Sequence, residues 1–241
     1  MADTFRTVCL AETASTNSYT KEYIAAHNEE NAVLILAKCQ SAGRGRQGKS
    51  FFSPDGGLYM SLLLPGSFVL PAEGLSLTAA AAVAICEVLQ SFDIKAEIKW
   101  VNDIYWQGKK LCGILCESVC DLAQRPRYII GIGLNLRTPA QGFPEEIAAK
   151  ATALDMDISA KALAEMIAEK LLKIIFLGLQ QPVLYEKYKT HSLVLGKRIV
   201  YIENGIEQSA QVLDIRSDGA LEIITEKGRE ILDSGEISIL L

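Results

Sequence analysis

The 241-residue sequence has only two histidines and no surplus of basic side chains. Its 24 lysines and arginines are outnumbered by 29 aspartates and glutamates, which gives a formal net charge of −5 at pH 7. General affinity for nucleic acid requires a basic surface, so this balance argues against DNA as a partner. Any anionic ligand must therefore be held by a local cluster of cations.

The sequence also lacks long apolar runs and a signal peptide. No stretch approaches the length of a membrane-spanning helix, and the first residues, MADTFRTVCL, show no secretory pattern. The six cysteines form no C-x-x-C pair, and Cys112, Cys116 and Cys120 recur every four residues, as small apolar groups on one face of a strand would. We therefore expect a reduced, soluble, cytoplasmic protein with no membrane partner and no metal bound by its cysteines and histidines.

Hydrophobic patterns divide the chain into two regions. Up to about residue 191, apolar runs alternate with helical patterns, whereas from Gly196 onward short alternating runs are separated by Asn-Gly, Asp-Gly, Lys-Gly and Ser-Gly turns. The second pattern is typical of a small all-β barrel. We predict a main domain over 1–191 and a C-terminal barrel over 192–241. Strands of the main domain are expected at 5–11, 32–37, 58–64, 96–100, 104–106, 110–119 and 128–136, and helices at 17–27, 75–92, 159–177 and 182–190.

The segment Gly43–Ser50, GRGRQGKS, satisfies the pattern of a phosphate-binding P-loop, G-x-x-x-x-G-K-[ST]. That motif works because a helix begins at its lysine and directs backbone N–H groups at the phosphates. Here the residues that follow include Pro54, Asp55 and two glycines, which favour a turn. A P-loop NTPase is therefore the less favoured hypothesis.

The same segment suits a different chemistry. Its glycines free the backbone, and the planar guanidinium groups of Arg44 and Arg46 can each bind a carboxylate or phosphate at two points. Such a loop fits a site that brings a carboxylate to a phosphate. The alternative is a solvated, flexible loop without a ligand.

Five short motifs stand in a fixed order along the chain. They are Ser15–Asn17 (STN), Gln40–Gly48 (QSAGRGRQG), Lys99–Asp103 (KWVND), Lys110–Leu115 (KLCGIL) and Gly131–Leu136 (GIGLNL). In this order they resemble the biotin–protein ligase family over nearly the whole chain, and the arginine-rich loop followed by the two lysine motifs is the specific part. The sequence departs from the family at Val101, where proline is usual. It also begins at the catalytic motifs without a helix-turn-helix, so it looks like the short, non-repressor form.

The resemblance implies an α+β fold, with a mixed central β-sheet flanked by helices as in class II tRNA synthetases, and a small C-terminal SH3-like β-barrel. It implies a biotin–[acetyl-CoA-carboxylase] ligase, an AMP-forming enzyme that joins carbon to nitrogen. Biotin and ATP give biotinyl-5′-AMP and pyrophosphate, and a lysine of a biotin carboxyl carrier protein domain then displaces AMP. ATP with Mg²⁺ is the implied co-substrate, and a homodimer is left open.

Site residues follow from the same resemblance. Arg46 and Lys110 match the catalytic cations, which are needed because two anions that must react repel each other. A mobile loop at Ser41–Phe52 is expected to order over the adenylate. The biotin-binding residues are expected to be Ser15, Thr16, Asn17, Gln40, Gly43, Arg44, Arg46, Lys110, Gly113 and Gly131. The ATP-binding residues are expected to be Arg44, Arg46, Lys99, Asn102, Lys110, Gly133 and Asn135.

Each assignment has a structural alternative. Ser15 and Thr16 can cap the helix that follows them, and Trp100 can belong to the core. The glycines can serve close packing, the lysines can lie on the surface, and Gln40 and Asp103 can hold a loop and a turn. A lipoate ligase of the same fold and a non-enzymatic biotin-responsive regulator are the rival functions; the STN and GRGR motifs argue against the first, and the acidic charge argues against the second.

Overall fold

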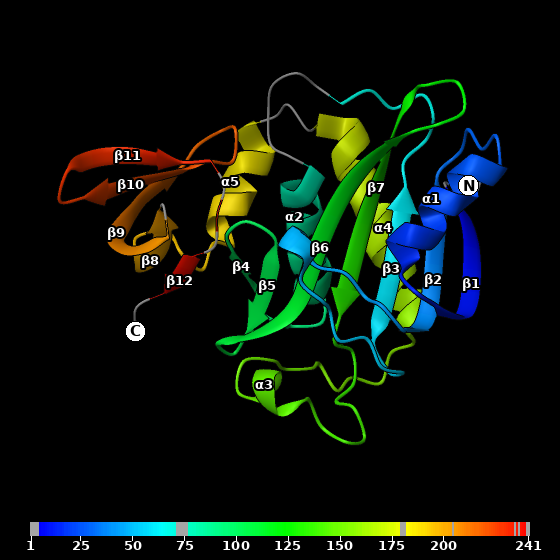
Figure 1. The fold of residues 1–241 in the computed structure, drawn as a ribbon, viewed down its shortest axis with the longest axis horizontal. Coiled ribbons are helices and arrows are strands. Elements are labelled where there is room, and N and C mark those ends of the chain that lie inside the picture. Colours follow the sequence, from blue (N-terminus) through cyan, green and yellow to red (C-terminus); the bar gives the residue numbers. More distant parts are fainter. Residues whose placement is uncertain are drawn as a thin grey trace.

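The computed structural model describes residues 5–70, 77–178, 182–203, 205–233, 235 and 237–239. A seven-stranded sheet forms the main body, with the strand order β1-β2-β3-β7-β6-β5-β4 (Figure 1). β1 and β2 are parallel and the other neighbours are antiparallel, so the predicted mixed central sheet is confirmed. Its strands are β1 (Arg6–Thr13), β2 (Val33–Gln40), β3 (Leu58–Leu63), β4 (Glu97–Lys99), β5 (Asp103–Trp106), β6 (Lys109–Cys120) and β7 (Pro126–Leu134).

Helices cover both faces of this sheet. The helix α1 (Thr16–Ala26) packs Tyr23 and Ile24 on one face, against alternate residues of β2 such as Val33. On the other face lie α2 (Leu77–Gln90) and α4 (Ala160–Gly178), which form the larger core with β2, β3 and β6. The alanines of α2 are fully or almost fully buried, because small side chains let the helix lie close to its neighbours. The predicted helix at 75–92 begins in a segment outside the described residues.

Two short elements were not predicted from the sequence. The helix α3 (Glu145–Ala148) and the 3₁₀ turn Arg46–Gly48 are too short to produce a hydrophobic period.

The peptide bond between Trp100 and Val101 is cis. Within the described part of the chain, no helix is both long enough and apolar enough to span a membrane.

A second sheet follows α5 (Pro182–Thr190) and is antiparallel throughout, in the order β11-β10-β9-β8-β12. The predicted all-β region is thus present, but the described strands leave β11 and β12 at opposite ends of the order and show no closed barrel. Its strands are β8 (Arg198–Glu203), β9 (Ile206–Ile215), β10 (Leu221–Thr225), β11 (Gly228–Leu232) and β12 (Ile237–Ile239).

Several contacts attach this C-terminal sheet to the edge of the main sheet at β4. Trp100 donates its indole N–H to the carbonyl oxygen of Gly219 (2.8 Å), and Lys189 of α5 pairs with Asp214 of β9 (2.6 Å). The backbone of Ile98 bonds to that of the segment between α5 and β8. Trp100 is 4% exposed, so it has the structural role that the sequence left open for it.

Candidate active site

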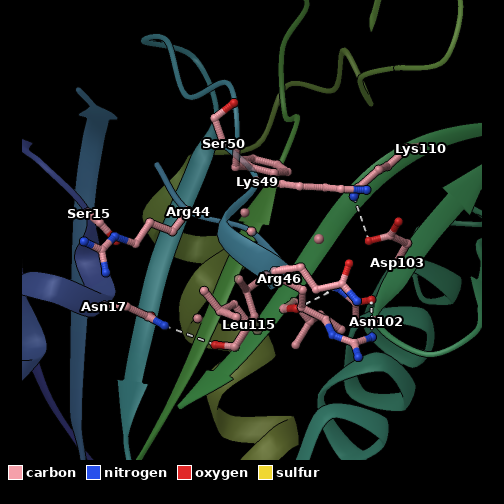
Figure 2. Close-up of a pocket in the computed structure, with 18 of the residues that line it drawn as sticks. Ser15, Asn17, Arg44, Arg46, Lys49, Ser50, Asn102, Asp103, Lys110 and Leu115 are labelled. Carbon is pink, nitrogen blue, oxygen red and sulfur yellow. Dashed lines mark hydrogen bonds and ion pairs between the residues drawn. The ribbon is translucent and has the colours of Figure 1, made fainter. Parts of the chain in front are cut away.

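A cavity of about 270 Å³ lies where the first turn of α1, the arginine-rich loop and the strands β4 to β7 meet (Figure 2). Residues of the C-terminal sheet also line it, so both parts of the chain contribute. Its lining residues are Ser15, Thr16, Asn17, Gln40, Arg44, Gly45, Arg46, Gln47, Lys49, Ser50, Phe51, Lys99, Trp100, Asn102, Asp103, Lys110, Gly113, Ile114, Leu115, Gly131, Ile132, Gly133, Gly235 and Ile237.

The arginine-rich loop folds back on itself above this cavity. Gly45 N–H donates to the carbonyl oxygen of Lys49 (2.7 Å), and Phe51 N–H donates to that of Gly43 (2.9 Å). The tight turn between them requires positive φ at Gln47 (55°) and Gly48 (74°), which glycine adopts readily. Lys49 has extended backbone, with φ −67° and ψ 146°, and the described residues 49–57 form no helix. The condition for a P-loop is therefore not met.

Phe51 at the end of the loop lies over two glycines of the sheet. A Cβ atom on Gly133 would lie 2.6 Å from the Phe51 ring, and one on Gly113 would lie 3.3 Å from it. Strands β6 and β7 pair at these two residues, so their glycines form one smooth floor under the ring. Gly113 and Gly133 therefore pack closely against Phe51 and also line the cavity.

Cations outnumber acidic groups in the described lining of the cavity, and Arg46 and Lys110 lie on the side away from Ser15 (Figure 2). Its described lining includes five lysines and arginines (Arg44, Arg46, Lys49, Lys99 and Lys110) and one acidic residue, Asp103. This local excess gives an acidic protein a place for an anion. Arg46 Nη1 donates to Asn102 Oδ1 (3.2 Å), a neutral partner that does not offset the guanidinium charge. Lys110 Nζ instead lies 2.7 Å from Asp103 Oδ1, so an anion must compete with that carboxylate.

The side chains of Arg44 and Arg46 extend toward different sides of the cavity. Figure 2 shows Arg44 extending toward the side where Ser15 lies, whereas Arg46 extends toward Asn102. Asn102 is itself fixed, because its Nδ2 donates to the carbonyl oxygen of Ile114 (3.0 Å). Lys99 lies on the Asn102 side as well, with its Nζ 3.4 Å from the hydroxyl of Tyr105.

Neutral polar groups form the other end. Ser15 is the N-cap residue of α1 and is 4% exposed, yet within the described residues its hydroxyl makes no capping hydrogen bond. Gln40 takes that role instead, since its Oε1 accepts from the backbone N–H (2.8 Å) and the hydroxyl (3.3 Å) of Thr16. Gln40 Nε2 then donates to Ser53 Oγ (2.9 Å). Gln40 therefore both lines the cavity and orders the start of α1.

The structure brings most of the predicted site residues together. Gly43 and Asn135 are not among the cavity lining. A Cβ atom on Gly43 would lie 2.5 Å from Ser53 Oγ, so this glycine serves the packing of the loop. Asn135 Nδ2 donates to the carbonyl oxygen of Thr152 (2.9 Å) and holds the chain beyond β7.

Other lining residues were missed by sequence reasoning. The sequence predicts for Lys49 only a place in the mobile loop at Ser41–Phe52 or in a P-loop, and for Asp103, the last residue of the KWVND motif, only a turn. No sequence motif includes Gly235 or Ile237, because these residues reach the cavity only through the contact between the two sheets.

Comparison with known proteins identifies the family. The model of the Biotin/lipoate A/B protein ligase family matches residues 10–135, from β1 to the end of β7. The chain belongs to this family. The match covers the strands and the loop that build the cavity.

Individual relatives agree with this assignment. The bifunctional ligase/repressor BirA of Bacillus subtilis is 37% identical over 142 residues, which are 58% of this chain and 43% of that protein. The chain thus spans less than half the length of that relative. The biotin--[acetyl-CoA-carboxylase] ligase of Mycobacterium tuberculosis is 27% identical over 239 residues, 95% of this chain and 86% of that one. The solved structure of a biotin protein ligase from Aquifex aeolicus with biotin and ATP has a TM-score of 0.78 at 29% identity and covers 98% of both chains.

Proposed function

We propose that the chain is an ATP-dependent biotin–protein ligase, a biotin–[acetyl-CoA-carboxylase] ligase. The observation that carries this proposal is a single cavity with a neutral polar end and a cationic end. The ureido ring of biotin is uncharged and needs fixed donors and acceptors, which Ser15, Thr16 and Gln40 offer. The cationic end suits the biotin carboxylate and the phosphates of ATP.

In the first step a biotin carboxylate oxygen attacks the α-phosphorus of ATP. A bond forms between them, the bond to pyrophosphate breaks, and biotinyl-5′-AMP remains. Arg46 and Lys110 act by lowering the repulsion between the two anions and by stabilising charge on the phosphoryl oxygens. Arg44 extends toward the Ser15 side of the cavity, and we propose that it contacts biotin there.

In the second step the deprotonated amine of a carrier lysine attacks the acyl carbon of the adenylate. A carbon–nitrogen bond forms, AMP departs with the electrons of the carbon–oxygen bond, and the nitrogen releases one proton to water. The loop at Ser41–Phe52 covers the intermediate and limits its hydrolysis by water. The partner we propose is a biotin carboxyl carrier protein domain.

Mg²⁺ fits as an ion that arrives with ATP. Proteins usually hold it through one or two carboxylates together with substrate phosphates. Asp103 is the acidic residue among the described cavity-lining residues, and the described part of the chain contains no cluster of three His, Cys, Asp or Glu side chains suited to a metal. Asp103 is the side chain that would face the ion, which would neutralise phosphate charge.

Biotin is favoured over lipoate by the neutral polar end of the cavity. The dithiolane ring of lipoate is apolar and would offer no partner to the buried hydroxyl of Ser15, which makes no capping hydrogen bond; this costs binding energy. Two further proposals concern the whole chain: residues 1–191 form a catalytic domain and 192–241 an SH3-like barrel. The protein would act in the cytoplasm without DNA or membrane partners, consistent with its net charge.

The decisive experiment is a transfer assay. The purified chain is incubated with ATP, Mg²⁺, biotin and a biotin-acceptor domain, and labelling is followed with streptavidin. We expect labelling that requires ATP and the acceptor lysine, with a Lys→Arg acceptor variant as the control. Pyrophosphate release is measured in parallel with biotin or lipoate. Faster turnover with lipoate, or no ATP-dependent labelling, would overturn the proposal.

A further inference from the structure

Asn17, in the first turn of α1, is held by protein groups on two strands. Its Nδ2 donates to the carbonyl oxygen of Leu115 (3.1 Å) and to Glu117 Oε2 (2.8 Å), and its Oδ1 accepts from Ser61 Oγ (2.6 Å). Both amide hydrogens are therefore used by the protein. Because Asn17 is 3% exposed, the loss of one of these partners cannot be replaced freely by water.

A third strand, β7, also packs closely against the Asn17 side chain. A Cβ atom on Gly131 of β7 would lie 2.8 Å from Asn17 Cγ, so a larger residue at this position would displace the amide. Asn17 thus connects the start of α1 to β3, β6 and β7 at once. Its role in the cavity is to fix the helix rather than to offer its amide hydrogens to a ligand.

Glu117 holds two successive turns of α1. One carboxylate oxygen accepts from Asn17 Nδ2, and the other lies 2.6 Å from Lys21 Nζ. Asn17 and Lys21 are four residues apart and so lie on the same face of the helix. Burial alone would raise the pKa of the Glu117 carboxyl, but the hydrogen bonds from Lys21 and Asn17, with the charges of Lys21 and Arg44, lower it below the usual value. The group is therefore a charged acceptor at neutral pH.

We propose that Glu117 is a positioning residue for the neutral end of the cavity. By holding Asn17 it fixes the first turn of α1, and with it the Ser15 and Thr16 groups that face the ligand. The inference rests on the proposed function, because it assigns biotin to that end of the cavity. A purely structural role would instead affect folding and all substrates together.

The test compares Glu117→Ala with Glu117→Gln. Alanine leaves an Asn17 amide hydrogen without its acceptor, so we expect the Kd for biotin to rise roughly 10- to 100-fold. The kcat for pyrophosphate release at saturating biotin should stay within about threefold of wild type, since the bound complex keeps its catalytic cations. Glutamine retains an oxygen that accepts from Asn17 and should restore the Kd to within about threefold.

Two further variants separate positioning from general stability. Lys21→Met removes the ion pair but keeps the Asn17 contact, and should change the Kd for biotin by less than about threefold. Glu222→Ala removes a comparable pair with Arg229 in the C-terminal sheet and should leave biotin binding unchanged. Calorimetric titration with biotin and thermal melts are measured for each protein.

The possible outcomes are distinct. If wild type binds biotin and Glu117→Ala binds it equally well, the positioning role is wrong while the proposed function stands. If Glu117→Ala loses kcat and melting temperature in step with biotin affinity and Glu117→Gln does not restore them, the role is structural and the proposal fails. If wild type itself does not bind biotin, the proposed function fails and this inference with it.

Discussion

Arg46 and Lys110 are the residues on which the proposed chemistry depends most directly. We expect Arg46→Ala and Lys110→Ala each to slow biotin-dependent pyrophosphate release by about 10²–10³-fold, the usual effect of losing one preorganised charge at a phosphoryl transition state. Their effect on folding should be small, because half-exposed pairs such as Lys110–Asp103 contribute only about 0.2–1 kcal/mol. Thermal melts are measured beside the rates.

The matched control is Lys161→Ala, which removes an exposed lysine that pairs with Glu165 within α4. This variant should keep wild-type activity. Adenylation within about twofold of wild type for both Arg46→Ala and Lys110→Ala would mean that these cations are ordinary surface charge.

A second residue-scale prediction concerns the glycine floor under Phe51. In Gly133→Ala the new Cβ would lie 2.6 Å from the ring, so Phe51 must move and the loop with it. Overpacking of this kind costs about 1–3 kcal/mol, and we expect a raised KM for ATP and a lower melting temperature. Gly113→Ala, at 3.3 Å from the ring, should be tolerated far better. Equal behaviour of the two variants in steady-state kinetics and melting would contradict this account.

At the scale of elements, the arginine-rich loop is the segment that ligands should change most. Its internal hydrogen bonds join Gly45 to Lys49 and Gly43 to Phe51, but Arg44 and Arg46 point into the cavity. We expect amide hydrogen exchange over 41–52 to slow when biotin and ATP are added, because bound anions would fix both side chains. The turn at Asp121–Arg125, which is held by its own hydrogen bonds, should not respond. Unchanged exchange in the loop would remove its covering role.

The elements themselves could largely be predicted from the sequence where hydrophobic periodicity is strong. The strand expected at 110–119 is observed at Lys109–Cys120, and the helix expected at 159–177 at Ala160–Gly178. Periodicity fails for α3, which has four residues, and for the loop turn, whose shape depends on positive φ at Gln47. Closure of the C-terminal strands into a barrel depends on contacts between distant strands, which alternation of residues along one strand does not encode.

Within the site, the predictable residues lie in the sequence motifs between Ser15 and Leu136, and the rest depend on tertiary contacts. Arg46 could be found because glycines and arginines alternate around it. The partner that orients it, Asn102, lies in a different motif, and the hydrogen bond between them follows only from the fold. The same holds for Glu117, whose two partners lie on a helix almost a hundred residues earlier in the chain.

At the scale of the molecule, residues of both the main sheet and the C-terminal region line the cavity, so we expect the C-terminal sheet to contribute to ligand binding. Trp100 lines the cavity and donates to the carbonyl oxygen of Gly219, and Ile237 of β12 lines the same cavity. We expect Ile237→Ala to raise the KM for ATP about 3- to 10-fold, because the enlarged end of the cavity binds the nucleotide less closely.

The control for this prediction is Ile199→Ala in the neighbouring strand β8. Ile199 is fully buried and pairs with β12, but it does not line the cavity. Both truncations should destabilise the sheet by about 2–5 kcal/mol, as large-to-small changes in a core usually do. Steady-state kinetics well below the melting temperature then separate the two effects. A KM for ATP that rises only in Ile237→Ala places the C-terminal sheet in the nucleotide site. An equal KM for ATP in both variants would show that the C-terminal sheet supports the main sheet without shaping the cavity.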